Sequence, residues 1–476
     1  MTRVTLALQE AAWPAAPAVE RIGLFLFVIL LPVMVVSGLP LLGRKLQPAD
    51  LAFLVAAVAV GLRLVRERVW PQTNGLGLAF AAFLVVEVGA TALSSDPARS
   101  AMVLAGSIYL VLVAVLVITA VRSTEVLRRL LDVWLATTAA VAALGLAGVA
   151  LGYVMGIRTP LARLAGDHWV FGRTWQLLST FQSPPIPNLA YSYLQVGVFL
   201  GLGMLAGEAA PRRRRAIAAA VALALLAIAF TQSRGVAPML LGLAVFLRSR
   251  PGRGAALARG SALAIGLALF VAVQLITYLQ VDAASIRWGD SGKRVEEQIR
   301  PDRPWYMSGP LVFIQPGTPY REVQLTLRYL PEHRVFLREA VLEMVRQHPL
   351  LGVGPGQFGQ ELVALWRAGR LDPVYRLFSP RYPHSVYLGF LAERGVLGLG
   401  AVLLLLVLAV RAAAAARKAA DPWVAGLGWG ALGCVVAFVI YGVDADILNF
   451  RWVWVLIGFT AVLGRLARTV PRQAAT

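Results

Sequence analysis

The sequence predicts an all-α fold, that of a polytopic membrane protein with about 12 transmembrane helices and a helical domain formed by one long outer loop. Hydrophobic residues make up 58% of the 476 residues and charged residues only 15%, whereas soluble domains carry about 25% charged residues. The apolar residues form continuous runs long enough to cross a bilayer as helices. Because these runs do not alternate with polar residues, they exclude a transmembrane β-barrel.

The predicted spans divide the chain into three parts. Residues 1–280 hold nine spans and an outer loop at 153–188, residues 281–385 form the long outer loop domain, and residues 386–476 hold three spans and a tail. The predicted spans are 23–42, 49–65, 76–93, 101–121, 130–152, 189–206, 215–231, 235–248, 259–280, 386–410, 423–443 and 451–466.

Basic residues give the orientation. The loops and termini on one side hold 22 Lys and Arg residues, and the short loops on the other side hold 5. Because cytoplasmic loops carry the excess of positive charge, both termini are expected in the cytoplasm. The loops 153–188 and 281–385 then face outward.

The net charge of +20 does not indicate a nucleic-acid partner. The excess lies in short loops between apolar runs, and the sequence contains no RNA- or DNA-binding motif. The chain has a single cysteine, Cys434, which excludes a disulfide within the chain and a four-cysteine metal site.

The entrance to the tenth span is the first candidate for chemistry. Pro383 is expected at the start of a helix, which places His384 and Ser385 on its first turn, at the membrane boundary. An imidazole there can take a proton from a hydroxyl group of a membrane-bound substrate. The alternative is an interfacial histidine without a chemical role.

The outer loop domain is expected to contain two helices. Residues 332–347 form an amphipathic pattern whose apolar positions are Val335, Val341, Leu342 and Val345. A glycine-rich turn at 352–356 follows, and a second helix is expected from 357 to about 367.

Three arginines on the outer side are candidates for binding phosphate, because a guanidinium binds phosphate through two parallel hydrogen bonds. They are Arg173 in the first outer loop, Arg234 in the tight turn 231–235, and Arg334 on the loop helix. The alternatives are an arginine that reaches lipid phosphate, for Arg234, and a solvated helix face, for Arg334.

Acidic residues offer weaker candidates. Glu87 is the one acid deep within a predicted span, and we expect it to have a buried polar partner. Asp444 and Asp446 resemble a metal-binding pair, but helix capping accounts for them equally well. The four histidines lack metal-ligand spacing, and no P-loop or metalloprotease motif is present.

These motifs together resemble the O-antigen ligase family of membrane glycosyltransferases. The outer-loop signature of that family is His, then Asn, Ser or Gln, then nine residues, then Gly-x-x-Gly, Thr or Tyr. His384, Ser385, Gly395 and Gly398 match it at every position. Arg173 with Leu177, the turn 232–235 and the run 334–358 are similar to further segments of the family.

The resemblance implies a GT-C-like glycosyltransferase in the bacterial inner membrane with its active site facing the periplasm. The implied donor is O-antigen on undecaprenyl pyrophosphate, the implied acceptor is lipid A–core oligosaccharide, and transfer is expected to invert the anomeric centre without a metal or other cofactor. Membrane lipids are the remaining expected partner, and nucleic acid is not one. The implied roles are general base for His384, pyrophosphate binding for Arg234, Arg334 and Arg173, and support for Ser385, Gly395, Gly398 and Asn188.

Three alternatives stay open. An O-antigen polymerase or a protein O-oligosaccharyltransferase of the same family would carry the same motifs, although the unequal lengths of the two outer loops favour the ligase. A flippase for lipid-linked glycans could also have 12 spans, but its charges are expected along a path through the membrane.

Overall fold

The structure is a computed structural model, and it describes most of the transmembrane part of the chain. The described residues are 18–33, 39–41, 44–156, 162–168, 172–177, 187–208, 210–231, 233, 235–249, 260, 264, 268, 333–371 and 383–469. In six stretches the structure describes only the backbone, and only of the residues that lie in a helix or strand. These stretches are 39–46, 162–168, 172–176, 187–188, 333–336 and 469.

Helices dominate the described residues, as predicted. They are α2 (Ala18–Leu30), α3 (Pro48–Glu67), α4 (Gly77–Ala92), α5 (Pro97–Ala120), α6 (Thr124–Met155), α7 (Pro187–Met204), α8 (Pro211–Thr231), α9 (Val236–Leu247), α11 (His333–Gln347), α12 (Phe358–Arg367), α13 (Val386–Ala416), α14 (Pro422–Tyr441) and α15 (Arg451–Thr469). The all-α prediction missed two short antiparallel hairpins. They are β1 (Leu39–Leu41) with β2 (Arg44–Leu46), and β3 (Ala162–His168) with β4 (Gly172–Leu177).

Ten of the predicted spans coincide with helices among the described residues. The first, 23–42, is helical only as far as Leu30, where α2 ends, and its residues 39–41 lie in strand β1. The ninth, 259–280, lies almost entirely outside the described residues. Six helices of the described part are long and apolar enough to cross a membrane, namely α3, α5, α6, α8, α13 and α14. The chain is therefore a multi-pass membrane protein.

Local sequence sets several helix starts. Asp96 and Ser123 accept hydrogen bonds from the first free backbone N–H groups of α5 and α6, and Asp421 does the same for α14. Proline follows the cap directly in α5 and α14, where its fixed φ suits the first helical position.

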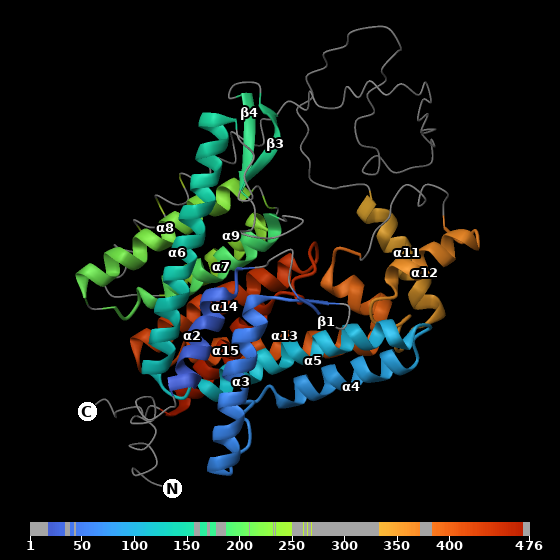
Figure 1. Ribbon diagram of the computed structural model, residues 1–476, viewed down its shortest axis with the longest axis horizontal. Coiled ribbons are helices and arrows are strands. Elements are labelled where there is room, and N and C mark those ends of the chain that lie inside the picture. The colour runs from blue at the N-terminus through green and yellow to red at the C-terminus, as the bar shows by residue number, and fades with distance from the viewer. Residues whose placement is uncertain are drawn as a thin grey trace.

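The core of the helical bundle surrounds α14, which packs against α7, α9, α13 and α15 (Figure 1). Glycines let the backbones approach closely here. A Cβ atom built on Gly242 of α9 would lie 2.3 Å from the carbonyl oxygen of Gly433 in α14. Small residues at such contacts are the usual means of packing transmembrane helices.

Helices α11 and α12 pack onto the N-terminal part of α13 and lie together on one side of the molecule (Figure 1). Both predicted loop helices are confirmed, and the turn between them has positive φ at Gly352, Gly354 and Gly356. The predicted apolar face was partly wrong, because Leu342 is 54% exposed. The buried side of α11 is Leu337, Ala340, Val341 and Met344.

Candidate active site

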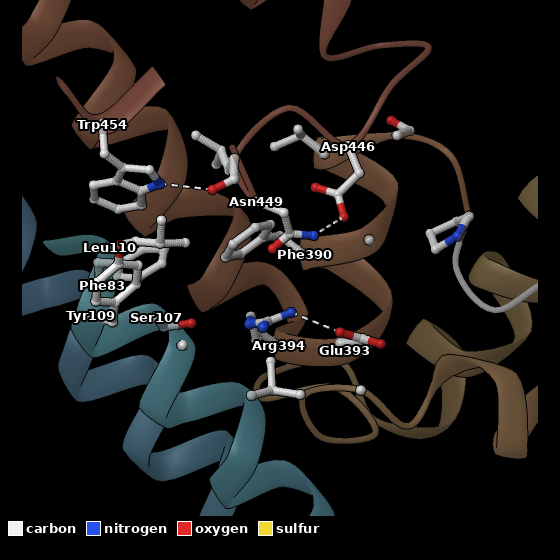
Figure 2. A pocket seen from close by; sticks show the side chains of 18 of the residues that line it. Phe83, Ser107, Tyr109, Leu110, Phe390, Glu393, Arg394, Asp446, Asn449 and Trp454 are labelled. Carbon is white, nitrogen blue, oxygen red and sulfur yellow. Dashed lines mark hydrogen bonds and ion pairs between the residues drawn. The ribbon is translucent and has the colours of Figure 1, made fainter. Parts of the chain in front are cut away.

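A cavity of about 560 Å³ lies where several helices meet. Its walls come from α4, α5, α13, α15, the residues just before α3 and α13, and the loop 442–450. His384, Glu393, Arg394, Asp446 and Arg451 all line it. In Figure 2, Arg394 and Glu393 on α13 lie below Asp446 and Asn449 of the loop, and Ser107 and Tyr109 of α5 lie to one side.

His384 and Ser385 stand just before α13, not on its first turn as the sequence suggested. Ser385 is the N-cap: its hydroxyl oxygen accepts the N–H of Leu388 at 3.3 Å and donates to the carbonyl of Gly442 at 3.2 Å. His384 has φ +54°, a left-handed conformation that non-glycine residues adopt only where surrounding contacts hold them. The cap on one side and buried Pro383 on the other fix the histidine at the cavity wall.

Gly395 breaks α13 one turn below the cavity wall. Its φ of +64° and ψ of −163° are not helical, and the freed N–H groups of Val396 and Leu397 bond to the carbonyls of Pro349 and Leu350. A Cβ atom at Gly395 would lie 2.3 Å from the carbonyl carbon and oxygen of Leu350. The first glycine of the signature therefore joins α13 to the segment after α11.

Gly395→Ala is expected to lower the free energy of unfolding by roughly 2 kcal/mol or more, because it adds backbone strain and a clash with backbone atoms. The measurement is thermal unfolding of the detergent-solubilised protein. Gly400→Ala is the matched control, since a Cβ there meets nothing within 4 Å. A similar melting temperature for both variants would contradict the predicted strain.

Gly398 makes room for the side chain of Arg394. A Cβ atom at Gly398 would lie 2.2 Å from the Cβ of Arg394 and 3.3 Å from the carbonyl oxygen of Phe390. The guanidinium carbon of Arg394 lies 4.4 Å from the ring centre of Phe390. Gly398 thus gives the Arg394 side chain the space to lie against its own helix.

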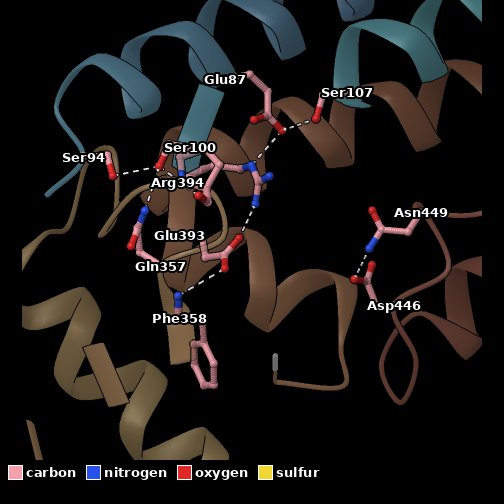
Figure 3. Close-up of polar contacts among 11 residues, drawn as sticks. Glu87, Ser94, Ser100, Ser107, Gln357, Phe358, Glu393, Arg394, Asp446 and Asn449 are labelled. Atoms are coloured by element: carbon pink, nitrogen blue, oxygen red, sulfur yellow. Dashed lines mark hydrogen bonds and ion pairs between the residues drawn. The ribbon is translucent and has the colours of Figure 1, made fainter. Parts of the chain in front are cut away.

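Arg394 lies between two carboxylates (Figure 3). Its Nε donates to Glu87 Oε1 at 2.7 Å and its Nη1 donates to Glu393 Oε2 at 2.8 Å. Ser107 also donates to Glu87 Oε1, at 3.1 Å, and the N–H of Phe358 donates to Glu393 at 3.3 Å. The expectation that Glu87 has a buried polar partner is confirmed.

Arg451 forms a second, partly buried pair at the cavity, with Asp50 at the start of α3. The guanidinium donates from Nε to Oδ1 at 2.8 Å and from Nη2 to Oδ2 at 2.9 Å, a two-pronged contact. Tyr109 donates to Asp50 Oδ1 at 2.7 Å. These contacts tie the start of α3 and the start of α15 to the middle of α5.

Asp446 lies in the loop between α14 and α15, outside the membrane-spanning helices. It accepts a hydrogen bond from Asn449 Nδ2 at 2.5 Å. Burial raises the pKa of Asp446 to about 6, the nearby charge of Glu393 adds to that increase, and Arg394 opposes it. The carboxylate is thus mainly ionised at pH 7 and mainly protonated at pH 5.

This pKa predicts how stability depends on pH. Because the folded protein holds the proton of Asp446 more tightly than the unfolded chain does, ionisation lowers the free energy of unfolding as pH rises from about 4 through about 6. Asp446→Asn removes that loss. Thermal unfolding at several pH values should show the melting temperature of the variant gaining on that of the natural protein between pH 5 and pH 7. A difference that stays constant over this range would contradict the assignment.

Arg234 itself lies outside the described residues, but both neighbours in its turn are described. The hydroxyl groups of Ser233 and Tyr441 lie 3.4 Å apart, and the Tyr191 hydroxyl donates to the carbonyl of Gly235. Tyr441 directly precedes Gly442, which binds Ser385. The turn around Arg234 and the turn of the histidine motif therefore contact consecutive residues at the end of α14.

The other predicted residues are described only through their backbones. Arg173 lies in β4, Arg334 lies in the first turn of α11 and Asn188 in the first turn of α7, and the positions of all three side chains lie outside the description. Leu177 is fully buried, and it packs on α6, where a Cβ at Gly145 would lie 2.6 Å from its Cδ1. The leucine of the Arg-x-x-x-Leu pattern thus fixes the β3–β4 hairpin to α6.

The expectation of a metal-free site remains a prediction. Within the described ranges, no group of three or more His, Cys, Asp or Glu side chains is arranged to hold a metal ion. Asp446, suggested by the sequence as one half of an acidic pair, bonds instead to Asn449.

Comparison with protein families agrees with the motifs at this cavity. A family model described as O-antigen ligase matches residues 219–403, which include α8, α9, α11, α12, the histidine motif and the break at Gly395. Over these residues the chain is similar to the O-antigen ligase family. No curated protein matches the sequence. The family indicates an enzyme of the membrane glycosyltransferase type, with ligase or polymerase activity.

The cavity has residues that the sequence analysis did not single out as site residues. Arg394 stands inside the signature, immediately before Gly395, as a lone arginine within an apolar run, and Glu87 is a lone acid within another. Two opposite charges buried in separate spans are a signal for pairing. Arg451 gave a weaker signal, since it looked like one of the few basic residues of the outer loops.

Proposed function

We propose that the chain is a ligase that transfers O-antigen polysaccharide from undecaprenyl pyrophosphate to a hydroxyl group of lipid A–core oligosaccharide. The observation that carries the proposal is the cavity lined by His384 together with arginines held in ion pairs and with apolar rings. The family match supports the same reaction class.

In the proposed reaction, His384 takes the proton of the acceptor hydroxyl group. The acceptor oxygen attacks the anomeric carbon of the donor sugar while the bond from that carbon to the phosphate oxygen breaks. Undecaprenyl pyrophosphate leaves with the bonding electrons, and the anomeric configuration inverts. General base catalysis of this kind contributes roughly 10²–10⁴ to the rate.

The leaving diphosphate gains negative charge in the transition state and needs cationic partners. We assign this role to Arg234 and Arg334, with Arg173 in support. The contact of the Ser233–Gly235 turn and of Ser385 with neighbouring residues of α14 supports placing Arg234 near the histidine.

The proposed location is the periplasmic side of the inner membrane, with both termini in the cytoplasm. Five basic residues of the low-charge side, Arg44, Lys45, Arg99, Arg234 and Arg451, belong to the loops and helix ends on that side. Arg451 lines the cavity, and Arg99 lies in the first turn of α5. Arg66 and Arg68, which belong to the side rich in basic residues, lie at the C-terminal end of α3, whereas the cavity lies at its N-terminal end. The charge asymmetry therefore supports a cavity that opens outward.

The test is transfer by the purified protein in lipid vesicles supplied with lipid-linked O-antigen and lipid A–core. The ligase is expected to produce polymer-bearing lipid A–core and free undecaprenyl pyrophosphate, and to do so with excess chelator. A polymerase would instead lengthen the lipid-linked glycan, and a flippase would move the donor across the bilayer without forming a product. Either result would replace the proposal, and dependence on added Mg²⁺ or Mn²⁺ would contradict its metal-independent form.

A further inference from the structure

The two arginines that line the cavity are already engaged by carboxylates. Arg394 lies between Glu87 and Glu393, at 2.7 and 2.8 Å, and Arg451 forms its two-pronged contact with Asp50. A diphosphate at either guanidinium would have to compete with a carboxylate that already binds it and neutralises much of its charge.

Among the described residues, the cavity lining and these partners together carry a net negative charge. Four carboxylates (Asp50, Glu87, Glu393 and Asp446) stand against the guanidiniums of Arg394 and Arg451. At pH 7 Asp446, with a pKa of about 6, is mainly ionised. A further anion placed here would meet repulsion that little water screens.

The same lining offers hydrogen-bond acceptors to a ligand rich in hydroxyl groups. Asp446, Glu393 and Asn449 present carboxylate and amide groups, and Phe390 and Trp454 present apolar rings. Ser107 of the cavity wall contacts Glu87, whose Oε2 is buried and has no hydrogen-bond partner within the described part of the chain. The volume of about 560 Å³ is in the range of small-ligand sites.

We propose that this cavity is the subsite for the acceptor sugar, an uncharged ring whose hydroxyl groups donate to Asp446 and Glu393, and that the diphosphate of the donor binds outside it. The inference rests on the proposed function and adds a division of roles: Arg394 and Arg451 hold the acceptor wall in place, and the donor diphosphate depends on other arginines. His384, on the same wall, then faces the hydroxyl group that it deprotonates.

The experiment compares Asp446→Asn and Glu393→Gln with the natural protein in the vesicle assay, varying donor and acceptor separately. Each variant is expected to raise the KM for the acceptor about tenfold, because the amide oxygen accepts a weaker hydrogen bond than the charged carboxylate, while the KM for the donor stays within about twofold. Glu361→Gln on α12, which does not line the cavity, is the matched carboxylate-to-amide control.

A binding measurement separates this role from a loss of fold. The thermal shift of each variant produced by undecaprenyl pyrophosphate alone should equal that of the natural protein. A changed thermal shift with an unchanged acceptor KM would place the donor in the cavity and overturn the inference. Unchanged KM values for both substrates, or equal increases in both, would also overturn it.

If the natural protein extends lipid-linked glycan instead of modifying lipid A–core, the proposed function fails. The same KM comparison, with lipid-linked glycan as acceptor, then tests the subsite.

Discussion

Replacing His384 with asparagine is expected to lower the rate of glycan transfer by roughly 10²–10⁴ while the protein still inserts and folds. The imidazole lies at the cavity wall, and an imidazole is suited to take a proton from a hydroxyl group near neutral pH. Asparagine is preferred to alanine because it tolerates the left-handed conformation that His384 adopts at φ +54°. The loss of activity is then separated from backbone strain.

The measurement is the initial rate of transfer under saturating donor and acceptor. His348→Asn is the matched control, because His348 is exposed after the end of α11 and does not line the cavity. Near-normal transfer by the His384 variant, with a melting temperature like that of the natural protein, would refute the role of general base.

The histidine signature could be recognised from the sequence, but its structural meaning could not. The sequence suggested that His384 and Ser385 begin a helix, whereas the structure makes Ser385 a cap bound to Gly442. The spacing to Gly395 acquires a reason only when α13 breaks there to receive the backbone of Leu350. Such a contact joins segments far apart in the chain, and hydrophobic patterns contain no information about it.

The buried charges, too, could be predicted from the sequence only in part. A buried partner for Glu87 could be predicted, because an acid within an apolar span must be compensated. Its identity as Arg394, 307 residues away, depends on α4 packing against α13. The exposed position of Leu342 was missed for a related reason, since the side of α11 that is buried depends on where α12 and α13 lie.

Arg394→Met is expected to cost roughly 3–5 kcal/mol of folding stability, the largest effect of any single substitution considered for this protein. Methionine keeps much of the apolar stem but removes the cation that stands between Glu87 and Glu393. Glu87 is 1% exposed, so its charge would remain in a nearly water-free environment. Thermal unfolding in detergent should show a large fall in melting temperature.

A second substitution tests whether the stranded charge is the cause. Adding Glu87→Gln to Arg394→Met should recover part of the lost stability, because the amide removes the uncompensated charge and can still accept the hydrogen bond from Ser107. Arg346→Met is the surface control: its pair with Glu343 is exposed, and pairs of that kind contribute roughly 0–1 kcal/mol. If Arg394→Met were as mild as this control, or if the double variant were no more stable than the single one, the buried pair would not be what holds α4 to α13 beside the cavity.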